Sequence, residues 1–361
     1  MKWTNGFLVC ALVLFPITAW AGAAEVLSPL EKLPPAERQR RLIEGARKEG
    51  EIMIYSSSGL EEIRALVKAF GKKYPFLQVR YNKKGGSQLF TVAQMEFVGK
   101  KYLADVYWAG YSTIGPMLRE KGMLARHLSP ERAAVAEEYK DREGYWTATR
   151  ISMAIFAYHA KKVPQDKVPK DYWDLLDPFW KGKISIDSSP GRFTHLLVEK
   201  YGWEKAADFH RKLAAQDPRI HRGRTARVQL ILAGEALGAL DINADNIIGM
   251  QKENAPLDFA VMEPTLLSLT SVAVPQTPAH PHAAALFYDY ILSKEGQEAL
   301  AVEDNIPIRD DVEIKSPELA KRYRDGRAQK KFIIQSPGTY DPAAEEKNDK
   351  LYVDTLLKKG R

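Results

Sequence analysis

The chain has 361 residues, of which 45% are hydrophobic, so it is long enough to form about two domains with cores of their own. Its formal net charge of +7 is modest, and no dense stripe of arginine and lysine interleaved with aromatic residues occurs, which argues against nucleic acid as a partner. The single cysteine, Cys10, leaves no pair for a disulfide and, beyond the first residues, no thiolate for catalysis or metal binding.

The first residues have the pattern of an export signal. Lys2 is followed by a short apolar run from 7 to 17, and the small residues within 19–23 fit a cleavage site. The run is shorter than the ~20 residues that a membrane-spanning helix requires, and Pro16 interrupts it. We therefore expect residues 1–23 to be a cleaved signal peptide, and the mature protein to be soluble in the periplasm.

A helical lead-in is predicted over residues 25–50. Pro35 suits the first turn of a helix, where its missing N–H is not needed, and Gly50 suits the end of one.

Three strand–turn–helix units follow, with strands predicted over 51–55, 76–81 and 104–108. Ser58, three residues before Glu61, has the spacing of a capping box at the start of the first helix. In a parallel sheet the three turns lie at the carboxyl ends of the strands, where open α/β sheets bind ligands and helix N-termini attract anions. The ligand contacts expected from these turns are Ser57, Ser58, Gly86, Ser87, Gly110 and Tyr111.

A second block of strands begins at about residue 151. Arginine forks match the paired oxygens of carboxylates and phosphates, whereas aspartate and asparagine suit a hydroxyl or amine group on the same ligand. The contacts expected from this block are Arg150, Ser188, Ser189, Arg192, Arg224, Asp241, Asn243 and Asn246. Two alternatives without a ligand contact stay open. Ser188 and Ser189 also suit a turn that only connects two elements, and Arg192 also suits an exposed surface.

Five pieces of the chain, in order, are EIMIYSSSGLEE, NKKGGSQL, LADVYWAG, FWKGKISIDSSPG and AALFYDYILSKEGQEAL. In this order they resemble the periplasmic ferric-ion and related solute-binding proteins of ABC importers. The resemblance implies an α/β fold of two Rossmann-like lobes joined by a hinge, a type II-like periplasmic binding protein of the Venus-flytrap kind. It implies lobe 1 at 26–147 and 268–311, lobe 2 at 148–267, and a C-terminal helical tail at 312–361 that packs on the lobes.

One departure from the family limits the choice of ligand. Ferric binders of this family carry two adjacent tyrosines, whose phenolate oxygens suit ferric iron, where this chain has Ala244 and Asp245. We therefore expect no metal site and no cofactor. His280 and His282 flank a proline and are expected in a loop rather than at a metal.

The expected function is that of the solute-binding component of an ABC importer. It would be a non-catalytic monomer that captures a small anionic solute, bearing a carboxylate or phosphate, and passes it to a permease in the inner membrane. Three alternatives stay open: a binding protein for ferric ion or a ferric complex, an exported hydrolase, and a sensor coupled to a receptor. The sequence lacks a G-x-S-x-G elbow, an H-E-x-x-H helix and a P-loop, which disfavours the hydrolase.

Overall fold

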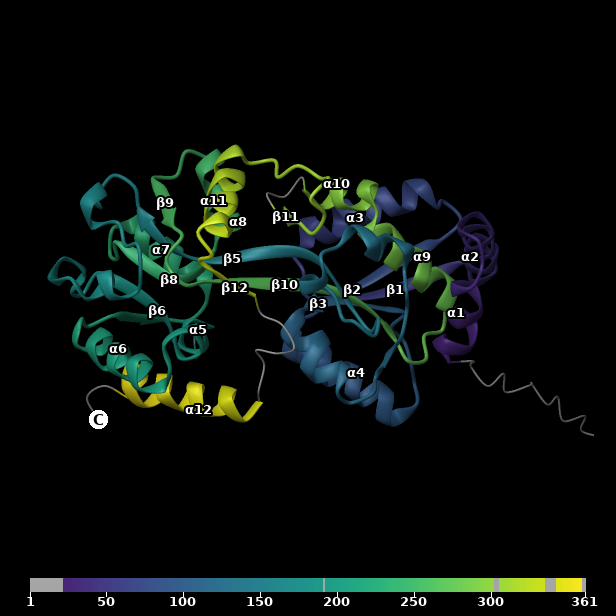
Figure 1. Ribbon diagram of the computed structural model, residues 1–361, viewed down its shortest axis with the longest axis horizontal. Helices are drawn as coiled ribbons and strands as arrows, with labels where there is room; N and C mark the ends of the chain where they lie inside the picture. The colour runs from purple at the N-terminus through teal and green to yellow at the C-terminus, as the bar shows by residue number, and fades with distance from the viewer. Residues whose placement is uncertain (1–21, 191, 302–304, 335–341, 359–361) are drawn as a thin grey trace, which may run out of the picture.

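The computed structural model describes residues 22–190, 192–301, 305–334 and 342–358 (Figure 1). All but the last two residues of the predicted signal peptide lie outside these ranges. The α-helices are α1 (Ala23–Glu31), α2 (Pro35–Glu49), α3 (Leu60–Lys73), α4 (Gly86–Gly99), α5 (Arg192–Tyr201), α6 (Trp203–Ala215), α7 (Arg224–Ala233), α8 (Ala244–Lys252), α9 (Pro281–Leu292), α10 (Lys294–Leu300), α11 (Pro317–Ala328) and α12 (Pro342–Tyr352).

The strands are β1 (Glu51–Ser56), β2 (Gln78–Lys83), β3 (Val106–Gly110), β4 (Leu124–Ala125), β5 (Thr147–His159), β6 (Ile184–Asp187), β7 (Arg219–His221), β8 (Gly238–Asn243), β9 (Leu257–Ala260), β10 (Thr265–Pro275), β11 (Ile306–Pro307) and β12 (Phe332–Ile334). Shorter 3₁₀ or π turns are η1 (Thr113–Arg119), η2 (Pro130–Ala134), η3 (Glu137–Tyr139), η4 (Gln165–Lys167), η5 (Trp173–Leu176), η6 (Pro178–Trp180) and η9 (Val353–Leu357).

The helix ends test two predictions from the sequence. Helix α2 begins at Pro35 and ends at Glu49, and Gly50 caps it in the left-handed conformation with φ of +75°, so this prediction is confirmed. The capping box predicted for Ser58 is wrong. Helix α3 starts one residue later than that spacing requires, so Gly59 is the N-cap residue and no side chain caps the helix.

The strands lie in the order β2-β1-β3-β10-β5-β8-β6-β7. Strands β1, β2 and β3 pair in parallel, as do β6, β7 and β8, so each set forms the strand–helix layout that the sequence predicts. Between the two sets, β5 and β10 pair with each other in antiparallel fashion and extend into both (Figure 1). We call the part with β1–β3 the first lobe and the part with β6–β8 the second lobe. The exact residue boundaries given above stay predictions.

Each lobe buries its own helices against the sheet. In the first lobe α1, α2, α3 and α9 cover the face that carries Ile52, Ile54 and Trp108. In the second lobe α5 and α6 pack with the residues around Ile184 and Ile186. This burial keeps the strands in place at the edge where the turns of both lobes meet.

Among its described residues, the C-terminal tail combines helices α11 and α12 with the short strand β12. Strand β12 pairs in parallel with β10, placing Phe332 opposite Thr265 and Ile334 opposite Leu267. Helix α12 packs on α5 and α6 of the second lobe. In the described ranges, no helix is long and apolar enough to cross a membrane.

Candidate functional site

The middle of the sheet, where β5 and β10 pass between the lobes, carries polar side chains. In their register Ser152 lies opposite Ser268, and Arg150 lies opposite Thr270. Directly opposed residues, and residues two apart along a strand, point to the same face of a sheet. These four side chains therefore share one face at the junction of the lobes, and we call this face the cleft floor.

Arg150 is held from the first lobe. Its Nε donates to Glu62 Oε1 at 2.6 Å, and its Nη1 donates to Ser152 Oγ at 2.5 Å. Only 13% of the Arg150 side chain and 6% of the Glu62 side chain are exposed. Burial alone would lower the pKa of Arg150, but the negative charges of Glu62 and Asp245 raise it. The guanidinium therefore stays charged.

A cleft of about 580 Å³ opens beside Arg150, between the first turn of α3 and helix α8. Its polar lining residues are Glu61, Glu62, Asn243, Asp245, Asn246, Glu253 and Asn305. Among the described residues that line it, four carboxylates face the single arginine. This part of the site, which we call the Arg150 half, therefore carries an excess of negative charge.

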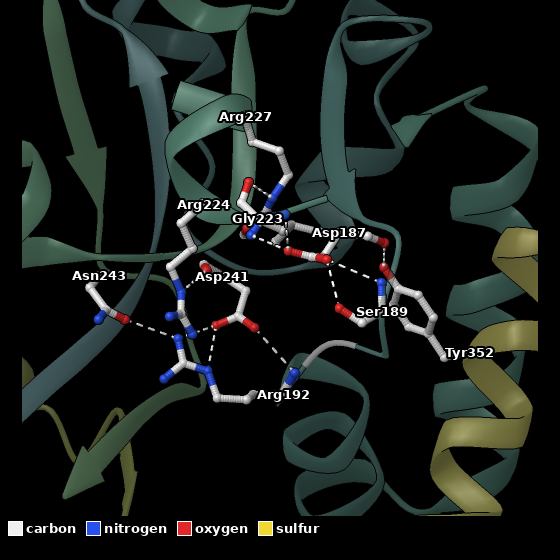
Figure 2. Close-up of polar contacts among 10 residues, drawn as sticks. Asp187, Ser189, Arg192, Gly223, Arg224, Arg227, Asp241, Asn243 and Tyr352 are labelled. Carbon is white, nitrogen blue, oxygen red and sulfur yellow. Dashed lines mark hydrogen bonds and ion pairs between the residues drawn. The ribbon is translucent and has the colours of Figure 1, made fainter. Parts of the chain in front are cut away.

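Arg192, the first residue of α5, borders the floor from the second lobe. Its Nη1 donates to Ser268 Oγ at 2.6 Å, the serine opposite the one that Arg150 contacts. Its Nη2 donates to Asn243 Oδ1 at 3.0 Å, and its Nε donates to Asp241 Oδ1 at 2.7 Å (Figure 2). Burial would raise the pKa of the Asp241 carboxyl, but the Arg192 charge and its hydrogen bond hold that pKa below its ordinary value.

Two more arginines surround this pair. The Nε of Arg224 donates to the main-chain oxygen of Asp241 at 3.2 Å. The buried Arg227 forms an ion pair with Asp187 at 3.1 Å, and burial lowers its pKa. Together with Arg192 these residues form what we call the Arg192 half. Arg192 pairs with Asp241 and Arg227 with Asp187, whereas Arg224 donates to a main-chain oxygen, so this half contains one more arginine than carboxylate (Figure 2). The charge of Asp245, in the Arg150 half, also acts on Arg224.

Asp187 organises the turn that carries the predicted Ser188 and Ser189. Its carboxylate accepts hydrogen bonds from the Ser189 backbone N–H at 3.1 Å, from Ser189 Oγ at 2.8 Å and from the Gly223 N–H at 3.2 Å. Ser188 is exposed and its backbone N–H donates to His221. Both serines thus have turn contacts, and both lie beside the Arg192 half.

The three turns of the first lobe come together as the sequence predicts. The Gly110 N–H donates to Ser57 Oγ at 3.3 Å, and the Lys84 N–H donates to the main-chain oxygen of Ser56 at 2.9 Å. A side chain added to Gly86 would come within 2.7 Å of Thr113, so the second and third turns also touch.

The predicted contacts in these turns differ in their exposure. Ser87 is exposed, whereas Ser58 is buried and its Oγ has no hydrogen-bond partner among the described residues. The Tyr111 ring lies in the core, where it packs edge-on against Trp146 at a centroid distance of 5.0 Å. Because this packing removes the ring from the cleft, we do not include the Tyr111 side chain in the proposed site.

The chain matches a known protein family. Residues 102–329 fit the model of the family described as bacterial extracellular solute-binding protein, and this segment is more than half of the chain. The chain belongs to this family. It is therefore a solute-binding protein rather than an enzyme, which confirms the prediction that it does not catalyse a reaction.

Individual proteins are also similar to this solute-binding protein. An Fe(3+)-binding periplasmic protein of Serratia marcescens is 24% identical over 259 residues, 69% of this chain and 75% of that protein. The iron-bound structure of HitA from Pseudomonas aeruginosa is 24% identical with a TM-score of 0.72, covering 84% of this chain and 99% of that chain. The structure of AfuA from Actinobacillus pleuropneumoniae with fructose-6-phosphate bound is 21% identical with a TM-score of 0.69, covering 86% and 99%. The two structures establish the same α/β periplasmic binding protein fold.

Among the described residues, neither the Ala244–Asp245 pair nor the two histidines beside Pro281 lie in a group of side chains that could hold a metal ion. Ala244 and Asp245 open helix α8, and His280 and His282 lie within hydrogen-bond distance of Asp105 and Glu49. Within the described part of the chain, no group of three or more histidine, cysteine, aspartate or glutamate side chains is placed to hold a metal ion.

The sequence reasoning missed Glu62, Ser152, Asp187, Arg227 and Ser268. Glu62 and Arg227 lie on predicted helices and resemble ordinary surface charges in the sequence. A signal did exist for Ser268 and Ser152, since each is a polar residue with an apolar residue on both sides in the sequence.

Proposed function

We propose that this protein captures a small anionic solute between its two lobes in the periplasm and delivers it to an ABC permease in the inner membrane. The observation that carries the proposal is the positive excess of the Arg192 half. Arg192 and Arg227 pair there with Asp241 and Asp187. Arg224 donates to the main-chain oxygen of Asp241, and the charge of Asp245 acts on it from the Arg150 half. An anion entering this half would therefore meet one more positive charge than this half neutralises.

The geometry of Arg192 suits a carboxylate or a phosphate. Its Nε and Nη2 already donate to Asp241 and Asn243, and its Nη1 donates to Ser268. One N–H of Nη1 is therefore left to donate to an anion oxygen, in an orientation that Asp241 fixes. A pre-oriented group loses less conformational entropy when the solute binds. The exposed donors Ser188 and Ser189 lie beside it on the next turn.

The Arg150 half suits a different part of the same solute. Its carboxylates and asparagines, such as Asp245 and Asn246, are acceptors for hydroxyl or amine groups. We therefore propose an organic solute that bears an anionic group at one end and hydroxyl or amine groups at the other. The fructose-6-phosphate bound to AfuA is a solute of this chemical class.

Binding would proceed by closure of the lobes about β5 and β10. Solute first meets the Arg192 half, and closure then adds the turns around Ser57 and Gly86 from the first lobe. Excluding water lowers the local dielectric constant and strengthens the polar contacts.

The first test is native mass spectrometry of the protein as purified, followed by calorimetric titration with inorganic phosphate, hexose phosphates and dicarboxylates. We expect a co-purified organic acid or phosphate ester and saturable binding of at least one class. A bound ferric ion without an organic anion would overturn the proposal in favour of the ferric alternative. Co-purification with a histidine kinase rather than a permease would favour the sensor.

A further inference from the structure

The C-terminal segment reaches the back of the Arg192 half. Tyr352, the last residue of α12, is fully buried, and its hydroxyl donates to the main-chain oxygen of Asp187 at 2.6 Å (Figure 2). Burial raises the pKa of Tyr352, so the hydroxyl keeps its proton and stays a donor. This contact joins two residues that are 165 positions apart.

Asp187 links Tyr352 to the Arg192 half. Its carboxylate holds the Ser189 N–H, the Gly223 N–H and the guanidinium of Arg227. A main-chain shift at Asp187 would therefore move the serine turn and the start of α7 together. Arg224, the first residue of α7, follows Gly223 directly.

The same helix also braces the element that carries Arg192. The Tyr352 ring packs edge-on against Phe193 at a centroid distance of 5.6 Å, one residue after Arg192. Asn348 lies within hydrogen-bond distance of His195, at 2.9 Å, on the next turn of α5. Helix α12 thus contacts both α5 and the Asp187 turn, the two supports of the Arg192 half.

We propose that Tyr352 is a positioning residue of the solute site, whose hydroxyl fixes the main chain at Asp187 and so places the polar groups of the Arg192 half. The inference rests on the function proposed above, because it assigns the solute to that half. Tyr352 lies beyond residues 102–329, so the segment that establishes the family does not contain it.

The test compares Tyr352→Phe with Tyr158→Phe in the full chain. Both tyrosines are at least 95% buried, and the Tyr158 hydroxyl donates to Asp258 at 2.9 Å on another part of the second lobe. Each variant deletes one hydroxyl and leaves the ring in place. Both should lower the melting temperature by a few degrees, since each loses a buried hydrogen bond.

Hydrogen exchange separates positioning from general stability without any ligand. We expect peptides that contain Ser189 and Gly223 to exchange faster in Tyr352→Phe, because their N–H groups depend on Asp187. The same peptides should be unchanged in Tyr158→Phe. Equal exchange of these peptides in wild type and Tyr352→Phe would overturn the inference.

Calorimetric titration with inorganic phosphate and fructose 6-phosphate then tests the solute. We expect Tyr352→Phe to bind about fivefold more weakly, the effect of one net hydrogen bond, and Tyr158→Phe to bind like wild type. Unchanged affinity in Tyr352→Phe, despite faster exchange, would overturn the positioning role. If the wild type binds neither probe, these phosphates are excluded as solutes, and the exchange result alone decides whether Tyr352 fixes the turn.

Discussion

The two halves of the cleft floor use the same residue in opposite surroundings. Arg150 and Arg192 each donate to one serine of the facing pair Ser152 and Ser268. Around Arg150 the described lining residues include four carboxylates, whereas Arg192 lies among further arginines.

This difference shows that an arginine at a cleft is not by itself an anion site. The charge of Arg150 is already matched by Glu62 at 2.6 Å, so an arriving anion would have to compete with a buried carboxylate. The Arg192 half contains one more arginine than carboxylate. We therefore assign the anion to the Arg192 half, although the sequence predicts both arginines as ligand contacts.

The largest expected effect follows Arg192→Ala. The change leaves the Asp241 side chain, 10% exposed, without its main partner, and should cost about 3 kcal/mol of unfolding free energy. It should also cost at least about 2 kcal/mol of solute binding. Urea unfolding and calorimetric titration measure the two quantities.

Arg322→Ala is the matched control for that variant. Arg322 is 22% exposed, against 23% for Arg192, and pairs with Asp258 of the same lobe at 2.8 Å. It should lose stability but keep the affinity of the wild type. Equal losses of affinity in both variants would show that Arg192 acts only through the fold.

The second effect concerns Asp241 and pH. Its pKa is lowered in the folded state, so its ion pair stabilises the protein above its ordinary pKa, near 4, and this contribution is lost as pH falls through the folded value. Asp241→Asn should therefore cost about 1.5 kcal/mol at neutral pH, and less and less in acid. Urea unfolding at a series of pH values measures the difference.

His280→Gln provides a control of opposite sign. The hydrogen bond to Asp105 raises the pKa of His280, so its contribution is complete below about 6.5 and is lost as pH rises through the folded value. If the difference in unfolding free energy between wild type and His280→Gln also became smaller in acid, the pKa directions given for Asp241 and His280 would both be contradicted.

The sequence predicts the framework of the fold because that framework is local. Apolar runs, serine- and glycine-rich turns and Gly50 each act within a few residues of chain, and the structure places the corresponding strands and helix end there. Strand β12 is not predicted, because three residues are too few to show an alternation of apolar and polar side chains.

The side-chain contacts within the site cannot be predicted from local sequence, because they depend on strand order. Arg192 and Asp241 are 49 residues apart, and Arg150 and Glu62 are 88 apart. The sequence selects both arginines, but which of them is neutralised depends on which helix packs beside each. The burial of the Tyr111 ring has the same kind of cause, because it depends on packing against Trp146, 35 positions away.

The third effect separates the arginines directly. Arg150→Ala should weaken solute binding by only about 1 kcal/mol, because Glu62 already matches its charge. Glu62→Gln should strengthen anion binding by a similar amount, since it frees the guanidinium while keeping the side-chain volume. Calorimetric titration of both variants measures this.

Arg309→Ala is the control for Arg150→Ala. Arg309 is 11% exposed, against 13% for Arg150, and pairs with Glu131 and Asp311. Its loss should leave affinity unchanged. A complete loss of binding in Arg150→Ala with little change in Arg192→Ala would reverse the assignment of the halves.

The smallest effects come from the serine pair itself. Ser152→Ala and Ser268→Ala delete the same hydroxyl at directly opposed positions, and each removes one hydrogen bond from one arginine. Both should cost roughly 0.5–1 kcal/mol of unfolding free energy. Only Ser268→Ala should weaken solute binding, about two- to threefold, because it loosens the arginine that meets the anion. Equal losses of affinity, measured by the same titration, would mean that the anion lies between the two arginines and is shared by both lobes.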